Sequence, residues 1–87
     1  MSQVIVHRNA VKYLKRLPEP TKNRIKTILK QLEVNPLEQP GIKHMVGDWA
    51  GYHRLRVGGF RILYWYEKKE DTVYVDHIGS RGDVYKL

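Results

Sequence analysis

Residues 52–66 read YHRLRVGGFRILYWY, and this stretch decides how the chain folds. Two runs of alternating apolar and polar residues flank a pair of glycines. Such a pair between alternating runs is typical of a two-residue β-hairpin turn, whose length fixes the register of the two strands. The sequence therefore predicts strands over 52–57 and 60–67, with Val57 directly opposite Phe60.

This register sorts the side chains of the predicted hairpin onto two faces, because successive residues of a strand point to opposite sides. One face is apolar and consists of Leu55, Val57, Phe60, Ile62 and Tyr64. We expect helices to cover this face. By the same alternation, His53 falls on the covered side.

The other face of the predicted hairpin is basic. It carries Arg54, Arg56 and Arg61, and the register places Arg56 opposite Arg61. Like charges directly opposite each other destabilise an antiparallel pair, so folding alone does not explain this choice. Arginine presents a planar fork that matches phosphate, and Tyr52 and Trp65 share the face, as stacking side chains do in single-stranded RNA recognition. The pattern favours an RNA-binding surface.

The segments before the hairpin predict one strand and two helices. Residues 2–7 form a short β-type run. Apolar residues at helical spacing follow over 9–17 and again up to Leu32. We expect the second helix to begin near Pro20 or Thr21, since threonine is a good N-cap and proline suits a first turn.

The remaining segments complete an α+β domain. Residues 36–51 are a long connection with a short extended piece at 42–45, and residues 72–78 predict a further strand. The predicted order is an N-terminal strand, a two-helix hairpin and a three-stranded antiparallel meander. The helices are expected to pack on one face of a single antiparallel sheet, and residues 1–87 to form a single domain.

Composition limits the partners of the chain. Its 87 residues hold 16 lysines and arginines against 9 acids, for a net charge of +7, and there is no cysteine. A small domain this basic is expected to bind a polyanion, either nucleic acid or an acidic protein. No apolar run is long enough for a membrane helix and no signal peptide is evident, so we expect a cytoplasmic location without membrane association.

The residues near the arginines suit RNA cleavage without a metal. Carboxylates that would hold metal ions are scattered over Glu67, Asp76 and Asp83, and we expect neither a metal nor a cofactor. On RNA, the substrate's own 2′-OH can attack the adjacent phosphorus, and fixed cations stabilise the charge that develops. A phenol or an imidazole must then move protons, and Tyr85 and His77 are the candidates.

The order of elements, together with YHRLRVGGFRILYWY and the closing IGSRGDVYKL, resembles the RelE family of toxin–antitoxin systems, within the RelE/ParE superfamily. The likeness covers nearly the whole chain. It implies a ribosome-dependent endoribonuclease, an mRNA interferase that cuts messages in the A site and inhibits translation during stress. It also implies a small acidic antitoxin as partner. Carried over by position, the implied active site comprises Arg54, Arg56, Arg61, Arg81 and Tyr85.

The chain departs from the family pattern at two places. Arg54 and Arg56 stand where the best-known members have lysines, and Ser80 stands where many have a histidine or basic residue. These departures leave the proton-transfer group open between Tyr85 and His77. Two other functions also stay open: a ParE-like inhibitor of DNA gyrase, and a non-catalytic RNA-binding module.

Overall fold

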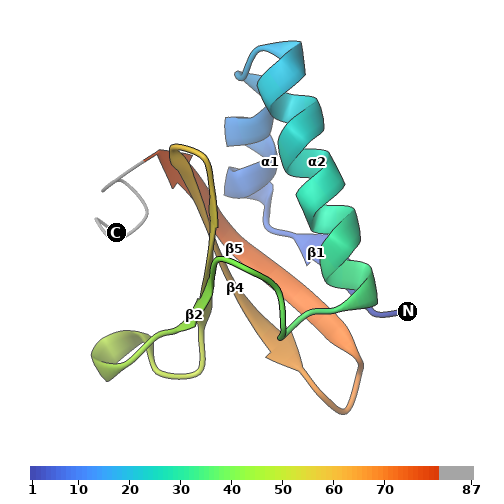
Figure 1. Cartoon of the computed structure of the whole chain (residues 1–87), viewed down its shortest axis with the longest axis vertical. Helices are drawn as coiled ribbons and strands as arrows, with labels where there is room; N and C mark the ends of the chain where they lie inside the picture. The colour runs from blue at the N-terminus through green and yellow to red at the C-terminus, as the bar shows by residue number, and fades with distance from the viewer. Residues whose placement is uncertain (81–87) are drawn as a thin grey trace.

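The computed structural model describes residues 1–80 and has the expected α+β architecture, with two helices on one side of a five-stranded sheet (Figure 1). The elements are β1 (Gln3–Val6), α1 (Arg8–Lys15), α2 (Glu19–Val34), β2 (Ile42–His44), the short 3₁₀ helix η1 (Gly47–Trp49), β3 (His53–Val57), β4 (Phe60–Glu67) and β5 (Thr72–Ser80). Over residues 1–80, neither helix combines the length and apolar character needed to cross a membrane.

The strand order is β1-β5-β4-β3-β2, and it differs from expectation at both edges. β2 adds an edge strand to the predicted three-stranded meander, where a short extended piece was expected. At the other edge, β1 pairs with β5 in parallel, so the sheet is not wholly antiparallel. A parallel pair needs a long crossover, and the intervening helices and hairpins provide one.

The hairpin of β3 and β4 has the predicted register. Val57 lies opposite Phe60, and Arg56 lies opposite Arg61. The predicted apolar face packs against the helices, with Phe60 only partly buried at its edge. The core cluster consists of Ala10, Leu14, Ile25, Leu29, Leu32, Leu55, Val57, Ile62, Tyr64, Val73, Val75 and Ile78. Within residues 1–80, neither α1 nor α2 lies on the opposite face of β3 and β4 (Figure 1).

Local side chains set where the helices begin. The Nδ1 atom of His7 accepts a hydrogen bond from the backbone N–H of Asn9 at 3.1 Å, which caps α1. α2 begins at Glu19 with Pro18 as its N-cap residue, so Thr21 is not the N-cap. Pro20 lies in the first turn of α2, where its missing N–H costs no helical hydrogen bond.

A β-bulge in β5 shapes the face that the helices leave open. Leu63 of β4 pairs with His77, but the next residue, Tyr64, pairs with Val75. Asp76 is therefore the extra residue of β5 and has no partner on β4. Bulges re-aim side chains, and here the bulge presents an acid beside the basic face.

Candidate active site

Three arginines lie together on the face of the sheet opposite the helices. Arg56 and Arg61 are a directly opposed cross-strand pair, and Arg54 lies two residues before Arg56 on the same side of β3. Arg56 is exposed, and the Nε of Arg61 is buried without a hydrogen-bond partner among residues 1–80. Within these residues, neither side chain of the Arg56–Arg61 pair forms an ion pair. Two adjacent guanidinium groups of this kind can together bind an anion.

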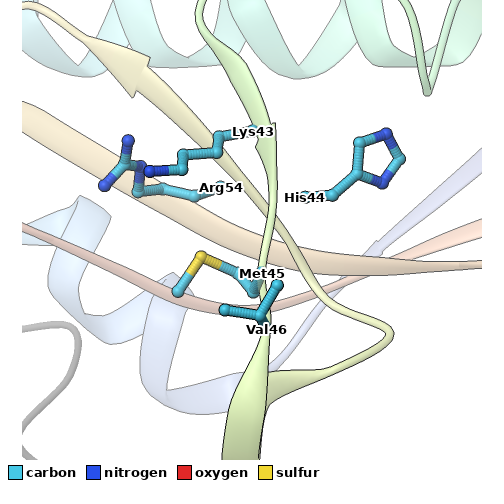
Figure 2. Close-up of a pocket in the computed structure, with 5 residues that line it drawn as sticks. All are labelled: Lys43, His44, Met45, Val46 and Arg54. Carbon is cyan, nitrogen blue, oxygen red and sulfur yellow. The ribbon is translucent and has the colours of Figure 1, made fainter.

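Lys43 extends this basic face, and the sequence analysis did not identify it. It lies on β2 directly opposite Arg54, and Figure 2 shows the two side chains running alongside each other. A pocket of about 280 Å³ opens here, lined by Lys43, His44, Met45, Val46 and Arg54. The expected extended piece at 42–45 was the one signal for this strand, but nothing in the sequence showed that it pairs with β3.

Arg24 adds a further cation at the tip of the hairpin. A methyl group at Gly58 would lie 3.3 Å from the Nη1 atom of this α2 residue, so its guanidinium rests against the turn. A small hollow of about 30 Å³ lies at the same tip, lined by Arg56, Gly58, Gly59, Phe60 and Arg61. Positive charge therefore continues from the open face around the end of the hairpin.

Aromatic rings border the other end of the arginine cluster. The Trp49 ring meets Tyr52 edge-on, with centroids 5.4 Å apart, and His77 at 6.3 Å. The Tyr52 hydroxyl donates a 2.5 Å hydrogen bond to Asp76 in the bulge of β5. Tyr52, the residue before β3, is thus tied to β5, and Leu63 of β4 is completely buried although it lies on the face opposite α1 and α2.

Two of these side chains have shifted acidity. The hydrogen bond to Asp76, followed by burial and the charge of Asp76, raises the pKa of Tyr52 to about 12. Burial lowers the pKa of His77, and the negative charge of Asp76 opposes this effect only in part. At neutral pH, His77 is therefore an uncharged imidazole on the arginine face, able to accept a proton.

The other predicted site residues fall into two groups. Trp65, predicted to bind RNA, is half-buried and stacks on Tyr74 with ring centroids 4.5 Å apart and planes inclined by 17°. Arg81 and Tyr85 lie outside the described residues.

β5 ends with Ser80 opposite Phe60, one pair beyond Gly79 and Arg61, so the last described residue of the chain lies next to the arginine pair. Over residues 1–80, no three histidine, aspartate or glutamate side chains are grouped as a metal site would need.

Comparisons with known proteins identify the family of the chain. Residues 4–85 match the family model described as ParE toxin of type II toxin-antitoxin system, parDE. The chain is 31% identical over 85 residues to the putative toxin RelE1 of Methanocaldococcus jannaschii, covering 95% of this chain and 93% of that protein.

Solved structures of toxins share the fold at lower identity. The RelBE2 toxin–antitoxin complex of Mycobacterium tuberculosis contains a chain with TM-score 0.82 and 23% identity, covering 92% of this chain and 98% of that one. The RelE–RelB complex of Pyrococcus horikoshii OT3 contains a chain with TM-score 0.82 and 24% identity, and the match covers 94% of this chain and 97% of that one. The isolated E. coli RelE toxin has TM-score 0.75 and 17% identity, and the match covers 98% of this chain and 92% of that one.

The family match and the archaeal relative span nearly the whole chain, and the expected likeness to RelE is confirmed. The chain belongs to the RelE/ParE superfamily and is the toxin of a type II toxin–antitoxin system.

Proposed function

We propose that this toxin is a ribosome-dependent endoribonuclease that cleaves mRNA in the A site by metal-independent attack of the 2′-OH. The observation that carries this proposal is the Arg56–Arg61 pair, opposed across β3 and β4 with Arg54 beside it. Two cations held side by side repel each other, and a bound anion relieves the repulsion. The RNA phosphodiester is the anion that fits an arginine fork.

The cations would act on the transition state. Attack of the 2′-oxygen on phosphorus forms the cyclic phosphate and breaks the bond to the 5′-oxygen, and negative charge gathers on the non-bridging oxygens. One well-placed donor is worth about 3 kcal/mol to such a charge. Arg54, Arg56 and Arg61 supply donors of this kind, and Arg81 is assigned to the same set by the family resemblance. Holding the 2′-OH in line supplies a further part of the rate enhancement.

Proton transfer is assigned to His77 and Tyr85. Arginine keeps its proton at any relevant pH, so Arg54 and Arg56 are poor acids and bases. His77 lies on the arginine face with a lowered pKa, which suits a base at neutral pH. The family resemblance implies that Tyr85 belongs to the active site, and we assign to it the complementary step, donation of a proton to the leaving 5′-oxygen.

The sharpest test compares two arginine substitutions that remove the same charge. Arg61→Ala removes a cation from the proposed site, whereas Arg16→Ala removes an exposed one at the end of α1. We expect Arg61→Ala to lower cleavage of ribosome-bound message about 10²-fold or more, and Arg16→Ala to change it little. Equal activity of the two variants at equal expression would place Arg61 outside the site.

The products distinguish the chemistry. We expect a 2′,3′-cyclic or 3′ phosphate on the upstream fragment, and no cleavage when the nucleotide at the cut site is 2′-deoxy. Cleavage should continue in EDTA on ribosomes prepared to tolerate the chelator. Cleavage of the deoxy substrate is incompatible with 2′-OH attack, and a chemical step that requires Mg²⁺ is incompatible with a metal-independent mechanism.

Inhibition of DNA gyrase is a second candidate, because the matched family model is described as a ParE toxin. It predicts loss of supercoiling by purified gyrase and no cleavage of message. The ribosome assay and a supercoiling assay on one toxin preparation separate the two functions. We favour RNA cleavage because of the opposed arginines.

We also propose a small acidic antitoxin as partner. The solved relatives include several RelBE and RelE–RelB complexes, and the net charge of +7 would attract an acidic chain. A segment disordered on its own can fold as it wraps a basic surface. Purification after co-expression with the adjacent acidic reading frame should yield a complex that weakens as salt rises. Elution of the free toxin at low salt, with both proteins folded, would contradict this partner.

A further inference from the structure

We propose that the pocket between β2 and β3 holds one nucleotide of single-stranded RNA, next to the nucleotide whose phosphodiester lies at Arg56 and Arg61. The pocket is the one lined by Lys43, His44, Met45, Val46 and Arg54. This inference rests on the proposed function and adds a substrate subsite to it. Lys43 binds the phosphate of that nucleotide, and Met45 and Val46 contact its base. Arg54, whose guanidinium has five N–H donors, is shared between this phosphate and the scissile one.

The cations of the pocket are held side by side by the backbone. Hydrogen bonds from Met45 N to the Tyr52 carbonyl at 2.9 Å and from Arg56 N to the Gly41 carbonyl at 3.2 Å flank the Lys43–Arg54 pair in β2 and β3. Directly opposite residues in such a ladder have Cβ atoms about 5 Å apart. Figure 2 shows both side chains extending the same way, so their charges face one anion together.

The apolar part of the pocket is exposed without a structural reason. Val46 is 81% exposed, although it lies only two residues beyond the end of β2, and Met45 is half-buried beside it. Figure 2 places the Met45 thioether on the same side as Lys43 and Arg54, whereas the His44 ring points away. An apolar surface against two cations fits a nucleotide, which offers a flat base and a phosphate. A methionine adapts to bases of different shape.

The spacing along β3 connects this pocket to the arginine pair. Arg54 and Arg56 are two residues apart on one strand, so their Cα atoms are separated by about 7 Å. This is close to the distance between successive phosphates of a polynucleotide. A strand of RNA with one phosphate at the Arg56–Arg61 pair therefore brings the neighbouring phosphate to Lys43 and Arg54. The pocket volume of about 280 Å³ accommodates one nucleotide.

The first experiment is a ¹⁵N chemical-shift titration of the toxin with a short single-stranded RNA made uncleavable by 2′-O-methyl groups. We expect the largest shifts at residues 43–46 and 54, together with the arginine pair. Shifts confined to other surfaces, or no shifts at millimolar RNA, would overturn the proposal.

Three variants then separate charge from apolar contact. Lys43→Gln should weaken binding of the same RNA about fivefold to tenfold and reduce the slope of log affinity against log salt by about 0.7, the value of one single-strand phosphate. Val46→Ser should weaken binding about threefold and leave the slope unchanged, since it removes apolar area and no charge. Lys26→Gln, an exposed change on α2, is the matched charge control and should have no effect.

The outcomes also separate the pocket from the proposed function. Loss of RNA affinity in Lys43→Gln without any cleavage by the wild-type toxin on ribosomes would leave the subsite standing and reject the nuclease. Cleavage by the wild type, together with unchanged KM and kcat in Lys43→Gln, would support the nuclease and reject the subsite. If Lys43→Gln binds RNA normally but loses affinity for an acidic antitoxin, the pocket is a protein site and the proposal is wrong.

Discussion

The two faces of the β3–β4 hairpin differ in composition, although alternate residues of the same two strands form them. On the helix-covered face, Leu55 and Ile62 are opposite each other and almost fully buried. One residue along, Arg56 and Arg61 are opposite each other on the open face. The first pair stabilises the fold by removing apolar surface from water, and the second opposes it by charge repulsion.

This contrast teaches how a domain of this size carries a site. A small chain has little core to spare, so the inward positions of the hairpin are apolar with the one exception of His53. The outward positions are free of that demand, and the turn fixes their register as firmly as it fixes the core. The strands thus act as a rigid frame on which cations are held at fixed spacing, as a site that stabilises charge requires.

The largest expected effect is a difference in stability between a substitution on the covered face and one on the open face. Ile62→Ala should lower the free energy of unfolding by about 2–5 kcal/mol, because it opens a cavity at a fully buried position. Arg61→Ala, one residue before it, should leave that free energy unchanged or raise it, because it relieves repulsion with Arg56. Urea denaturation of both variants measures the difference.

The same two substitutions should affect cleavage activity in the opposite way. Once corrected for the folded fraction, Ile62→Ala should cleave normally and Arg61→Ala should not. A marked loss of stability in Arg61→Ala would show that the open face also supports the fold, and the division between the two faces would fail.

The next largest effect on stability is expected at the turn of the hairpin. Gly58 has φ +58°, a left-handed conformation that side chains disfavour, and an added Cβ there would press on Arg24. Gly59 has no atom within 4 Å of such a Cβ and does not share the positive φ. We expect Gly58→Ala to destabilise by about 1–2 kcal/mol. Gly59→Ala should stay within about 0.5 kcal/mol, and equal thermal shifts for both would contradict this description of the turn.

A smaller effect tests the hydrogen bond that spans the open face. Tyr52→Phe should cost about 1 kcal/mol, because it leaves the partly buried Asp76 carboxylate without its donor. Tyr66→Phe is the control, since Tyr66 donates to Asp71 at the same 2.5 Å distance but in an exposed setting. In the wild type, ultraviolet titration should show a tyrosine that ionises near pH 12, and Asp76→Asn should lower that value.

The hairpin and its register could be predicted because the information is local. Two glycines between alternating runs specify the turn, and the turn pairs Arg56 with Arg61 without reference to the rest of the chain. The core face followed from the same alternation. The strand order and the parallel pairing of β1 with β5 could not be predicted, since they depend on contacts between residues about 70 positions apart.

The site was predictable in part for the same reason. Arg54 and Arg61 follow from local pairing, but Lys43 joins them through β2, which lies behind a long irregular connection. Asp76 reaches Tyr52 because of a bulge, and sequence alternation alone assigns no bulge. Arg81 and Tyr85 remain predictions from the family resemblance, since they lie outside the described residues.

The smallest effect concerns a polar residue that the alternation places on the covered face. His53 is 9% exposed, its Nδ1 has no hydrogen-bond partner within residues 1–80, and its ring lies 4.4 Å from His44 and 5.3 Å from Tyr64. Burial, and then the charge of His44, lowers the pKa of His53.

The sign of the resulting pH dependence follows from linkage. The unfolded chain takes up a proton at His53 below about pH 6.5, whereas the folded chain resists it until lower pH. Stability should therefore be complete at pH 7.5 and decline as the pH falls through this window, and His77, also with a lowered pKa, acts in the same direction. Urea titrations at pH 7.5 and 5.5 should show a smaller decline in His53→Gln than in the wild type, and His44→Gln should fall between them. An identical decline in all three proteins would mean that the folded chain protonates His53 as readily as the unfolded chain does, and that this covered position tolerates charge as the open face does.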